Sequence, residues 1–345
     1  MRVLVTGGTG FVGAHTVAAL SDAGHEVRVL ARRPAQLAES LRPLGATVPD
    51  VAEGDVLDER AVARAMDGCD AVVHAAAVFS TDPRRAEEMR RTNALATERV
   101  VAYAAERGLD PVVHVSTTVA LTRRGGSGPD LPLGDIRGAY AESKIASERV
   151  ARRLQEQRAP VVTVYPGSVF GPHDPYRGEQ GERVRWILRG LFPLWPAGGI
   201  HVVDVRDVAR VIAAVLEPRR EGRPGAVPQP PRYVVPGHHV SGAHLYGTLA
   251  ELTGRRLPHV TLPGSVIGPA TRLIDAVQAR LPERWRYPAD HEGAEVVLRH
   301  TRMDDSRARA ELGVEPTPLA DVLRDTVRWL VESGRLPARR AGRLG

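Results

Sequence analysis

A glycine-rich turn near the start of the chain is the strongest local constraint on its fold. Gly7, Gly10 and Gly13 follow the apolar stretch 2–6 and lead into a segment with helical apolar spacing from Phe11 to Asp22. A tight strand-to-helix turn needs glycine, and so does close approach of the backbone to a diphosphate. The amino end of a helix also offers free N–H groups to phosphate. We therefore predict a dinucleotide site formed by Gly7, Thr9, Gly10, Phe11, Val12 and Gly13.

Strand-like and helix-like segments alternate through the first 165 residues. This alternation implies βαβ units with right-handed crossovers, so the predicted fold is α/β with a Rossmann-type doubly wound parallel sheet. The expected strands are 2–6, 26–31, 48–53, 71–75, 111–116 and 161–165, and the main expected helices are 11–22, 58–66 with Asp58 as cap, one through 93 and 103, and 140–156.

The regular pattern ends after Pro166, where prolines become frequent. A chain of 345 residues is long for one core, so a second, smaller and mostly helical substrate-binding domain is expected. The expected divisions are a Rossmann domain over 1–166 with a return to the sheet near 200–216, a substrate-binding domain over 167–199 and 217–335, and a disordered basic tail over 336–345.

The composition excludes several broad classes. One cysteine, Cys69, rules out a disulfide framework and fits a reducing cytoplasm. The most lipid-like stretch, 259–281, is interrupted by prolines and charges, so no membrane span is predicted. The net charge of +6 comes from arginines spread beside carboxylates, and aromatic residues make up only 4%, which argues against nucleic-acid binding. No metal site is predicted.

Two arginines stand where a cofactor-selecting residue is expected. Arg32 and Arg33 follow the second strand, where a carboxylate would hold the ribose of NAD and a guanidinium suits the 2′-phosphate of NADP. NADP(H) is therefore preferred over NAD. Asp55, beside Val56, is expected either to contact the adenine or to cap a helix. The small residues Ala75, Ala76 and Ala77 are expected along the cofactor's ribose.

The only lysine of the chain, Lys144, lies four residues after Tyr140 in a strongly helical segment. Residues at this spacing share one helix face. A free tyrosine titrates at about 10, and a nearby ammonium lowers that pKa. We therefore expect Tyr140 to exchange a proton with a substrate oxygen, helped by Lys144, while a hydroxyl from Ser116, Thr117 or Thr118 holds that oxygen.

Together these motifs resemble the extended short-chain dehydrogenases/reductases of the NAD(P)-dependent epimerase/dehydratase group. The resemblance runs from Arg2 to about Val215. It implies that Thr118 is the catalytic hydroxyl, with Ser116 as a lesser candidate, and that Asn93 has a structural or water-holding role. It also implies that Pro166, Gly167, Ser168 and Val169 lie beside the nicotinamide.

Three functions are compatible with this resemblance. An NADP-dependent oxidoreductase that interconverts a carbonyl and an alcohol, similar to dihydroflavonol-reductase-like and hydroxysteroid-dehydrogenase-like members, is favoured by Arg32 and Arg33. A nucleotide-sugar epimerase or dehydratase that retains NAD(P) is the alternative. A non-catalytic NADP sensor is disfavoured, because it would not need Tyr140 and Lys144.

The substrate pocket is expected between segment 78–91, the glycine-rich loop 123–138 and the region after Phe170. The aromatic side chains there suit an apolar carbonyl or alcohol, although ordinary packing explains them equally well. A homodimer face is expected, by resemblance alone, on the helices near 93–106 and 140–156. The aromatic residues of the expected substrate pocket are Phe79, Tyr176, Trp186, Phe192 and Trp195.

Overall fold

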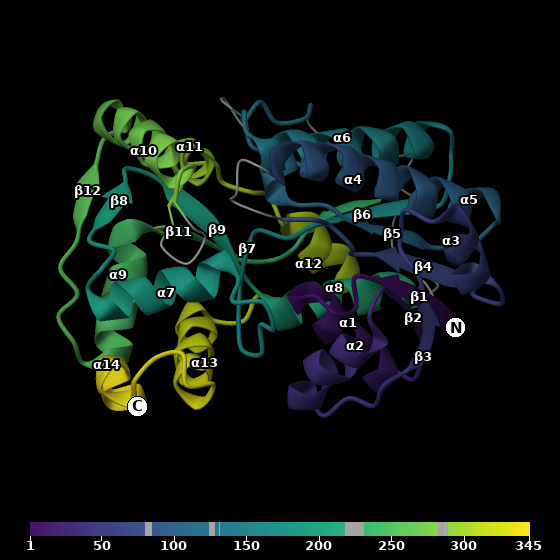
Figure 1. Cartoon of the computed structure of the whole chain (residues 1–345), viewed down its shortest axis with the longest axis horizontal. Coiled ribbons are helices and arrows are strands. Elements are labelled where there is room, and N and C mark those ends of the chain that lie inside the picture. The colour runs from purple at the N-terminus through teal and green to yellow at the C-terminus, as the bar shows by residue number, and fades with distance from the viewer. Residues whose placement is uncertain (80–84, 124–127, 131, 218–230, 282–286, 288) are drawn as a thin grey trace.

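The computed structural model describes residues 1–79, 85–123, 128–130, 132–217, 231–281, 287 and 289–345. Figure 1 shows two lobes side by side, one containing the amino terminus and a large sheet, the other containing the carboxyl terminus. Five residues of the glycine-rich loop 123–138, at 124–127 and 131, lie outside the described residues, as does the proline- and arginine-rich stretch 218–230. None of the described helices is long and apolar enough to cross a membrane.

The first lobe is built on a seven-stranded sheet with the order β10-β6-β5-β4-β1-β2-β3, and all its strand pairs are parallel. The strand order reverses between β1 and β4, where doubly wound sheets bind their ligands. The predicted Rossmann-type fold is therefore confirmed. The strands are β1 (Arg2–Thr6), β2 (Glu26–Ala31), β3 (Asp50–Glu53), β4 (Ala71–His74), β5 (Val112–Val115), β6 (Val161–Tyr165) and β10 (Arg232–Val234).

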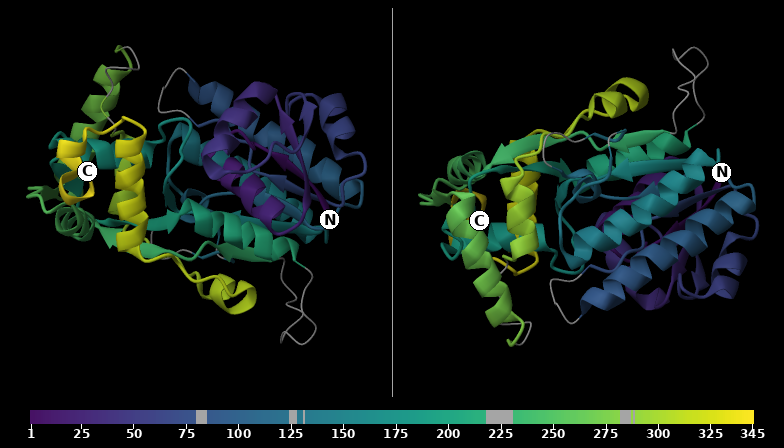
Figure 2. Two further views of the ribbon diagram at one scale, coloured as in Figure 1. Left: turned by 90° about the horizontal axis from the view of Figure 1, so that it is seen from below. Right: turned by 90° about the horizontal axis from the view of Figure 1, so that it is seen from above.

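Helices cover both faces of this sheet, as Figure 2 shows from below and from above. Alternation along β1 explains why both faces need cover: Val3 and Val5 join one buried apolar cluster and Leu4 joins another. One face is covered by α1 (Phe11–Asp22), α2 (Pro34–Leu41), α8 (Val205–Leu216) and α12 (Ser306–Leu312), the other by α3 (Glu59–Met66), α4 (Ala86–Thr97), α5 (Tyr103–Glu106) and α6 (Ala139–Glu156).

The second lobe contains two small sheets and several helices around its own apolar core, in which Phe170 and Trp195 are fully buried. One sheet has the order β11-β9-β7 and the other pairs β12 with β8. The elements are β7 (Ser168–Phe170), β8 (Leu194–Pro196), β9 (Gly199–Asp204), β11 (His238–Ser241), β12 (Val260–Leu262), α7 (Glu179–Arg189), α9 (Gly242–Thr253), α10 (Gly264–Gln278), α11 (His291–Leu298), α13 (Leu319–Glu332) and α14 (Ala338–Ala341).

The prediction that the chain returns to the main sheet near 200–216 is wrong for the strand of that segment, β9. β9 pairs with β7 and β11, and only α8, which follows it, packs beneath the large sheet against α1. The seventh strand of that sheet is β10, within the region assigned to the substrate domain. Three buried residues are enough to pair with the open edge of β6, but they are too few to show a strand period in the sequence.

The prediction of a disordered tail over 336–345 is also wrong. Residues Ala338–Ala341 form α14, and a 3-10 turn follows at Gly342–Leu344. Leu336 and Ala341 are buried in the core of the second lobe, and the Arg255 side chain donates to the Arg340 carbonyl. Two apolar side chains therefore anchor a segment that contains three arginines in ten residues.

Candidate active site

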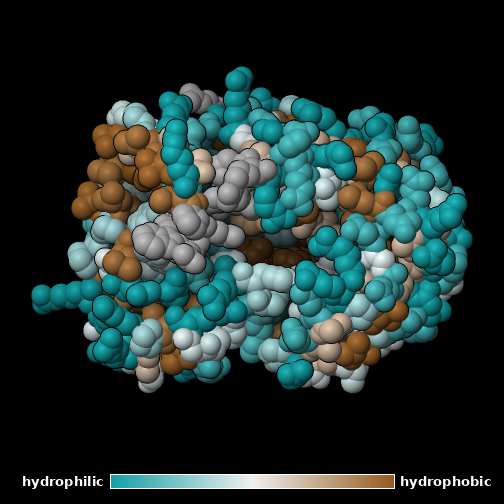
Figure 3. Space-filling view, in the orientation of Figure 1, coloured by the Kyte–Doolittle hydropathy of each residue, from teal (hydrophilic) through white to brown (hydrophobic). Residues whose placement is uncertain are grey.

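A cleft of about 1260 Å³ lies between the two lobes at the carboxyl ends of the large sheet's strands. In Figure 3 its mouth is the hollow in the middle of the molecule, with hydrophobic atoms inside and mostly hydrophilic atoms around it. Residues from both lobes line it, among them the glycine-rich turn and Tyr140. The described residues include no cluster of three or more histidine, cysteine, aspartate or glutamate side chains placed to hold a metal ion.

The glycine-rich turn forms one end of the cleft. Gly7 has a φ of +79°, and its carbonyl accepts from the Gly10 N–H at 2.9 Å. A β-carbon on Gly13 would lie 2.1 Å from the Gly7 oxygen, so only glycine lets α1 pack this closely on the turn. This geometry fits a diphosphate group. Of the predicted residues, Gly7, Thr9, Gly10 and Phe11 line the cleft, whereas Val12 and Gly13 support the turn from behind.

The end of β2 brings Arg32 and Arg33 to the same cleft. The Arg32 guanidinium lies 3.7 Å from the Asp55 carboxylate, which also accepts from the Leu57 N–H at 2.9 Å. Asp58 is the N-cap of α3, as the sequence predicts. Asp55 therefore does not cap this helix. Val56 lines the cleft next to Asp55.

Three alanines after β4, Ala75–Ala77, line the cleft as predicted. His74 before them is buried and hydrogen-bonded to the Thr6 hydroxyl at 2.8 Å, as expected of a packed residue. Asn93 on α4 accepts from the Val78 N–H at 2.7 Å, and its amide donates to the Val78 carbonyl and the Ser143 hydroxyl. Asn93 therefore ties the segment after β4 to α6.

The segment joining β6 to β7 forms another wall. Gly167, Ser168 and Val169 line the cleft. Pro166 is buried and does not line the cleft, and its carbonyl accepts from the Thr118 N–H at 2.9 Å. A β-carbon on Gly167 would lie 2.2 Å from the His201 oxygen, which explains the glycine just before β7, where the chain comes close to β9.

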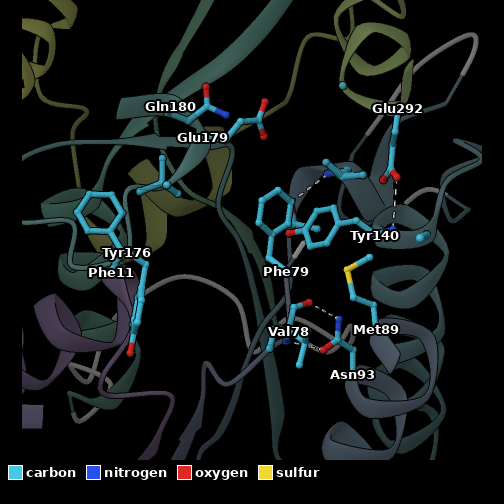
Figure 4. Close-up of a pocket in the computed structure, with 18 of the residues that line it drawn as sticks. Phe11, Val78, Phe79, Met89, Asn93, Tyr140, Tyr176, Glu179, Gln180 and Glu292 are labelled. Carbon is cyan, nitrogen blue, oxygen red and sulfur yellow. Dashed lines mark hydrogen bonds between the residues drawn. The ribbon is translucent and has the colours of Figure 1, made fainter. Parts of the chain in front are cut away.

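Tyr140, the second residue of α6, reaches the cleft opposite this wall. Its ring meets Phe79 edge to face, with centroids 4.9 Å apart. Figure 4 shows the two rings together, with Phe11 and Tyr176 across the cleft. The Thr117 side chain acts on the phenol in the direction that lowers its pKa. Thr117 and Thr118 both line the cleft, whereas Ser116 is buried away from it and its hydroxyl has no hydrogen-bond partner in the described residues.

In this arrangement Lys144 is not among the groups that shift the pKa of Tyr140, contrary to the expectation from the sequence. The Lys144 ammonium is buried, donates to the Val115 carbonyl at 3.1 Å and does not line the cleft. Burial raises the pKa of Tyr140 to about 12, with Glu292 and Glu179 adding to the rise and the Thr117 side chain opposing it. Burial lowers the pKa of Lys144 to about 8, against the attraction of Glu148.

Glu292 is a cleft residue that sequence reasoning missed. It lies on α11 of the second lobe, and its carboxylate accepts from the Ala141 N–H at 2.6 Å and from the Tyr140 N–H at 3.3 Å. Burial raises the pKa of Glu292 to about 7. No local motif marks this residue, because its partners lie about 150 positions earlier in the chain.

The predicted aromatic lining of the substrate pocket is only partly correct. Phe79 and Tyr176 line the cleft and are exposed to solvent. Trp195 and Phe192 are buried in the core of the second lobe, and Trp186 packs against Tyr287. The three are therefore packing residues. Their burial follows from the small size of that lobe, which needs large side chains to fill its core.

Comparison with known proteins agrees with this geometry. The sequence profile described as "NAD dependent epimerase/dehydratase family" matches residues 3–229. A protein of Synechocystis named "Putative dihydroflavonol 4-reductase" is 31% identical over 96% of this chain and 94% of its own length. A 3 beta-hydroxysteroid dehydrogenase/Delta 5-->4-isomerase of Mycobacterium tuberculosis is 27% identical over 91% of this chain and 86% of its own length.

Solved structures share the whole fold. The crystal structure of gox2253 superposes with a TM-score of 0.78 and 25% identity, over 97% of this chain and 99% of its own. The dTDP-glucose 4,6-dehydratase DesIV from Streptomyces venezuelae, solved with NAD and TYD bound, has a TM-score of 0.71 and 26% identity, over 98% of this chain and 99% of its own.

Proposed function

The chain belongs to the NAD dependent epimerase/dehydratase family, and from this premise we propose that it is an NADP-dependent oxidoreductase acting on an uncharged carbonyl compound or its alcohol. Tyr140 is its proton donor and acceptor. The observation that carries the proposal is the position of Tyr140, which lines the cleft together with Thr117. A substrate oxygen placed between these two hydroxyls would meet a proton donor and a second hydrogen-bond partner.

The surroundings of Tyr140 suit the proton-donating step. Burial, Glu292 and Glu179 raise the pKa of Tyr140 to about 12, so the phenol is protonated near neutral pH. A protonated phenol gives its proton to the oxygen of a carbonyl as that oxygen becomes an alcohol. In the opposite direction the phenolate takes the proton of the alcohol.

The cofactor assignment rests on the glycine turn and the two arginines at the end of β2. The turn leaves room for a diphosphate, and Arg32 and Arg33 can form charge-assisted hydrogen bonds to a 2′-phosphate. NADPH bound there supplies the hydride. Gly167, Ser168 and Val169 bound the cleft on the opposite side.

The charges of the second lobe favour an uncharged substrate over a nucleotide sugar. Arg183 is already paired with Glu179 and Gln180 and lies over the Trp195 ring. A diphosphate in this part of the cleft would therefore meet mainly acidic side chains, at a cost in electrostatic energy. Among the described residues of this lobe, six carboxylates and two arginines line the cleft: Asp174, Glu179, Glu182, Asp275, Asp290 and Glu292, with Arg177 and Arg183.

Turnover assays with a panel of ketones, steroids and nucleotide sugars, each with NADPH and with NADH, test the proposal. We expect stoichiometric release of NADP⁺ with at least one uncharged ketone and no conversion of nucleotide sugars. Conversion of a nucleotide sugar without net release of oxidised cofactor would instead identify an epimerase or dehydratase. Absence of turnover with every carbonyl, despite NADPH binding, would contradict the enzymatic assignment.

A further inference from the structure

The helix that carries Tyr140 has no cap from its own sequence. Gly138 is the N-cap residue of α6, and it has no side chain to accept from the first free N–H groups of the helix. The Tyr140 and Ala141 N–H groups instead donate to the two oxygens of Glu292, at 3.3 and 2.6 Å. The cap of the catalytic helix is thus supplied from outside the helix.

Glu292 reaches this helix from the other lobe. It is the second residue of α11, 152 positions after Tyr140, and it lines the cleft. Figure 4 shows its side chain directed at the backbone of α6 beside the Tyr140 ring. A β-carbon on Gly138 would lie 2.1 Å from a Glu292 oxygen, so the glycine makes room for the carboxylate. The contact is therefore built by residues of both lobes.

We propose that Glu292 is a positioning residue for Tyr140: its carboxylate caps α6 from the substrate-binding lobe and holds the phenol at the place where the substrate oxygen binds. This inference rests on the proposed function. It makes the substrate lobe part of the catalytic machinery, because the Tyr140 and Ala141 N–H groups are capped only when α11 is docked against α6. A carboxylate at the positive end of a helix is favourable on electrostatic grounds as well.

The charge on Glu292 also acts on the phenol. Its negative field is one of the causes that raise the pKa of Tyr140, after burial. The groups that face Glu292 are Asp290 on its own helix and Glu142 on α6, both acidic, together with the Tyr140 and Ala141 amides. Glu179 on α7 acts on the phenol in the same direction as Glu292. Removing the Glu292 charge should thus lower the pKa of Tyr140.

Two substitutions separate the cap from the charge. Glu292→Gln keeps an oxygen that can accept from the Ala141 N–H but removes the charge, whereas Glu292→Ala removes both. Glu295→Gln is the matched control, because Glu295 lies on the same helix, pairs with Arg299 and does not line the cleft. For each variant we would measure kcat, KM, the Kd for NADPH and, by ultraviolet difference titration against the same variant carrying Tyr140→Phe, the pKa of the phenol.

We expect Glu292→Ala to lower kcat by up to about 100-fold, the cost of a displacement of about 1 Å at a reacting group, with the NADPH Kd unchanged. Glu292→Gln should recover most of that loss, and its phenol should titrate at lower pH than in the wild type. Glu295→Gln should match the wild type in every measurement. Wild-type kcat in Glu292→Ala, or an unshifted phenol titration in Glu292→Gln, would overturn the proposal.

The phenol titration needs no substrate, so it distinguishes this inference from the proposed function. If no carbonyl is turned over but the phenol pKa falls in Glu292→Gln, the proposed function fails and the link between Glu292 and Tyr140 stands. If Glu292→Ala does not fold, the comparison of Glu292→Gln with Glu295→Gln still decides the outcome.

Discussion

The rings of Tyr140 and Phe79 meet at 90°, with their centroids 4.9 Å apart. Phe79 follows β4, and Tyr140 begins α6, so this contact joins two segments that meet only in the folded chain. An edge-to-face pair contributes about 0.5–1.5 kcal/mol beyond burial. Phe79 therefore restricts the orientation of the phenol while remaining 48% exposed at the cleft.

Replacing the phenol tests its role directly. Tyr140→Phe removes the hydroxyl proposed to give the proton but keeps the ring that contacts Phe79. We expect turnover to fall by about 10²–10⁴-fold, the contribution of a positioned acid or base, with little change in the Kd for NADPH. Tyr103→Phe on α5, a residue that does not line the cleft, is the control. Near-normal turnover in Tyr140→Phe would reject the mechanism.

The two threonines that line the cleft can be ranked by substitution. Resemblance to the family favours Thr118, whereas Thr117 is the hydroxyl that acts on the pKa of Tyr140. We expect Thr117→Val to reduce kcat more than Thr118→Val does, and to raise the pKa of Tyr140 because the Thr117 side chain lowers it. Thr117→Ser should restore both properties. A larger loss in Thr118→Val would return the role to the residue favoured by resemblance.

Cofactor selection should depend on the end of β2. Arg32→Ala with Arg33→Ala removes two guanidinium groups from the cleft, and we expect at least a 10-fold weaker Kd for NADPH, with a much smaller change for NADH, because only NADPH carries the 2′-phosphate. Fluorescence titration with both cofactors measures this. Arg42→Ala, at an exposed arginine outside the cleft, should affect neither. Equal losses for NADPH and NADH would exclude a phosphate contact.

Stability should depend on pH through Lys144. Its pKa in the folded protein is about 8, against about 10.4 in an unfolded chain, so the unfolded chain binds more protons between these values. The free energy of unfolding should thus rise with pH across this range, by roughly 3 kcal/mol at most. Lys144→Met should lose this rise. Urea unfolding of both proteins at pH 7, 8, 9 and 10 tests it, and parallel pH curves would contradict the lowered pKa.

Glycine substitutions separate the cofactor turn from ordinary helix propensity. A β-carbon on Gly13 would lie 2.1 Å from the Gly7 oxygen, so we expect Gly13→Ala to destabilise the protein and abolish dinucleotide binding. Gly247 on α9 has open space around it, and Gly247→Ala should stabilise by about 0.5–1 kcal/mol. Calorimetry and NADPH titration measure both. Retained binding in Gly13→Ala would show that the turn can relax.

Local pattern alone was sufficient for six of the seven strands of the first lobe, β1 to β6. The strands at 2–6, 26–31 and 161–165 were predictable to the residue, because buried parallel strands are short apolar runs between turn residues. The glycine turn, Arg32, Arg33 and Tyr140 were predictable as cleft residues, because loops at one end of a parallel sheet converge. These features depend on neighbours within about a dozen residues, and sequence periodicity reports such neighbours.

Tertiary structure decided what depends on distant contacts. The pairing of β10 with β6, the docking of the basic tail through Leu336 and Ala341, and the burial of Ser116 away from the cleft could not be predicted from local pattern. The electrostatics of the phenol belong here too: the Lys144 ammonium is buried against the Val115 carbonyl, and Glu292, not Lys144, is among the groups that shift the pKa of Tyr140. Burial and contacts across 150 residues arise only when the lobes pack, and no local period encodes them.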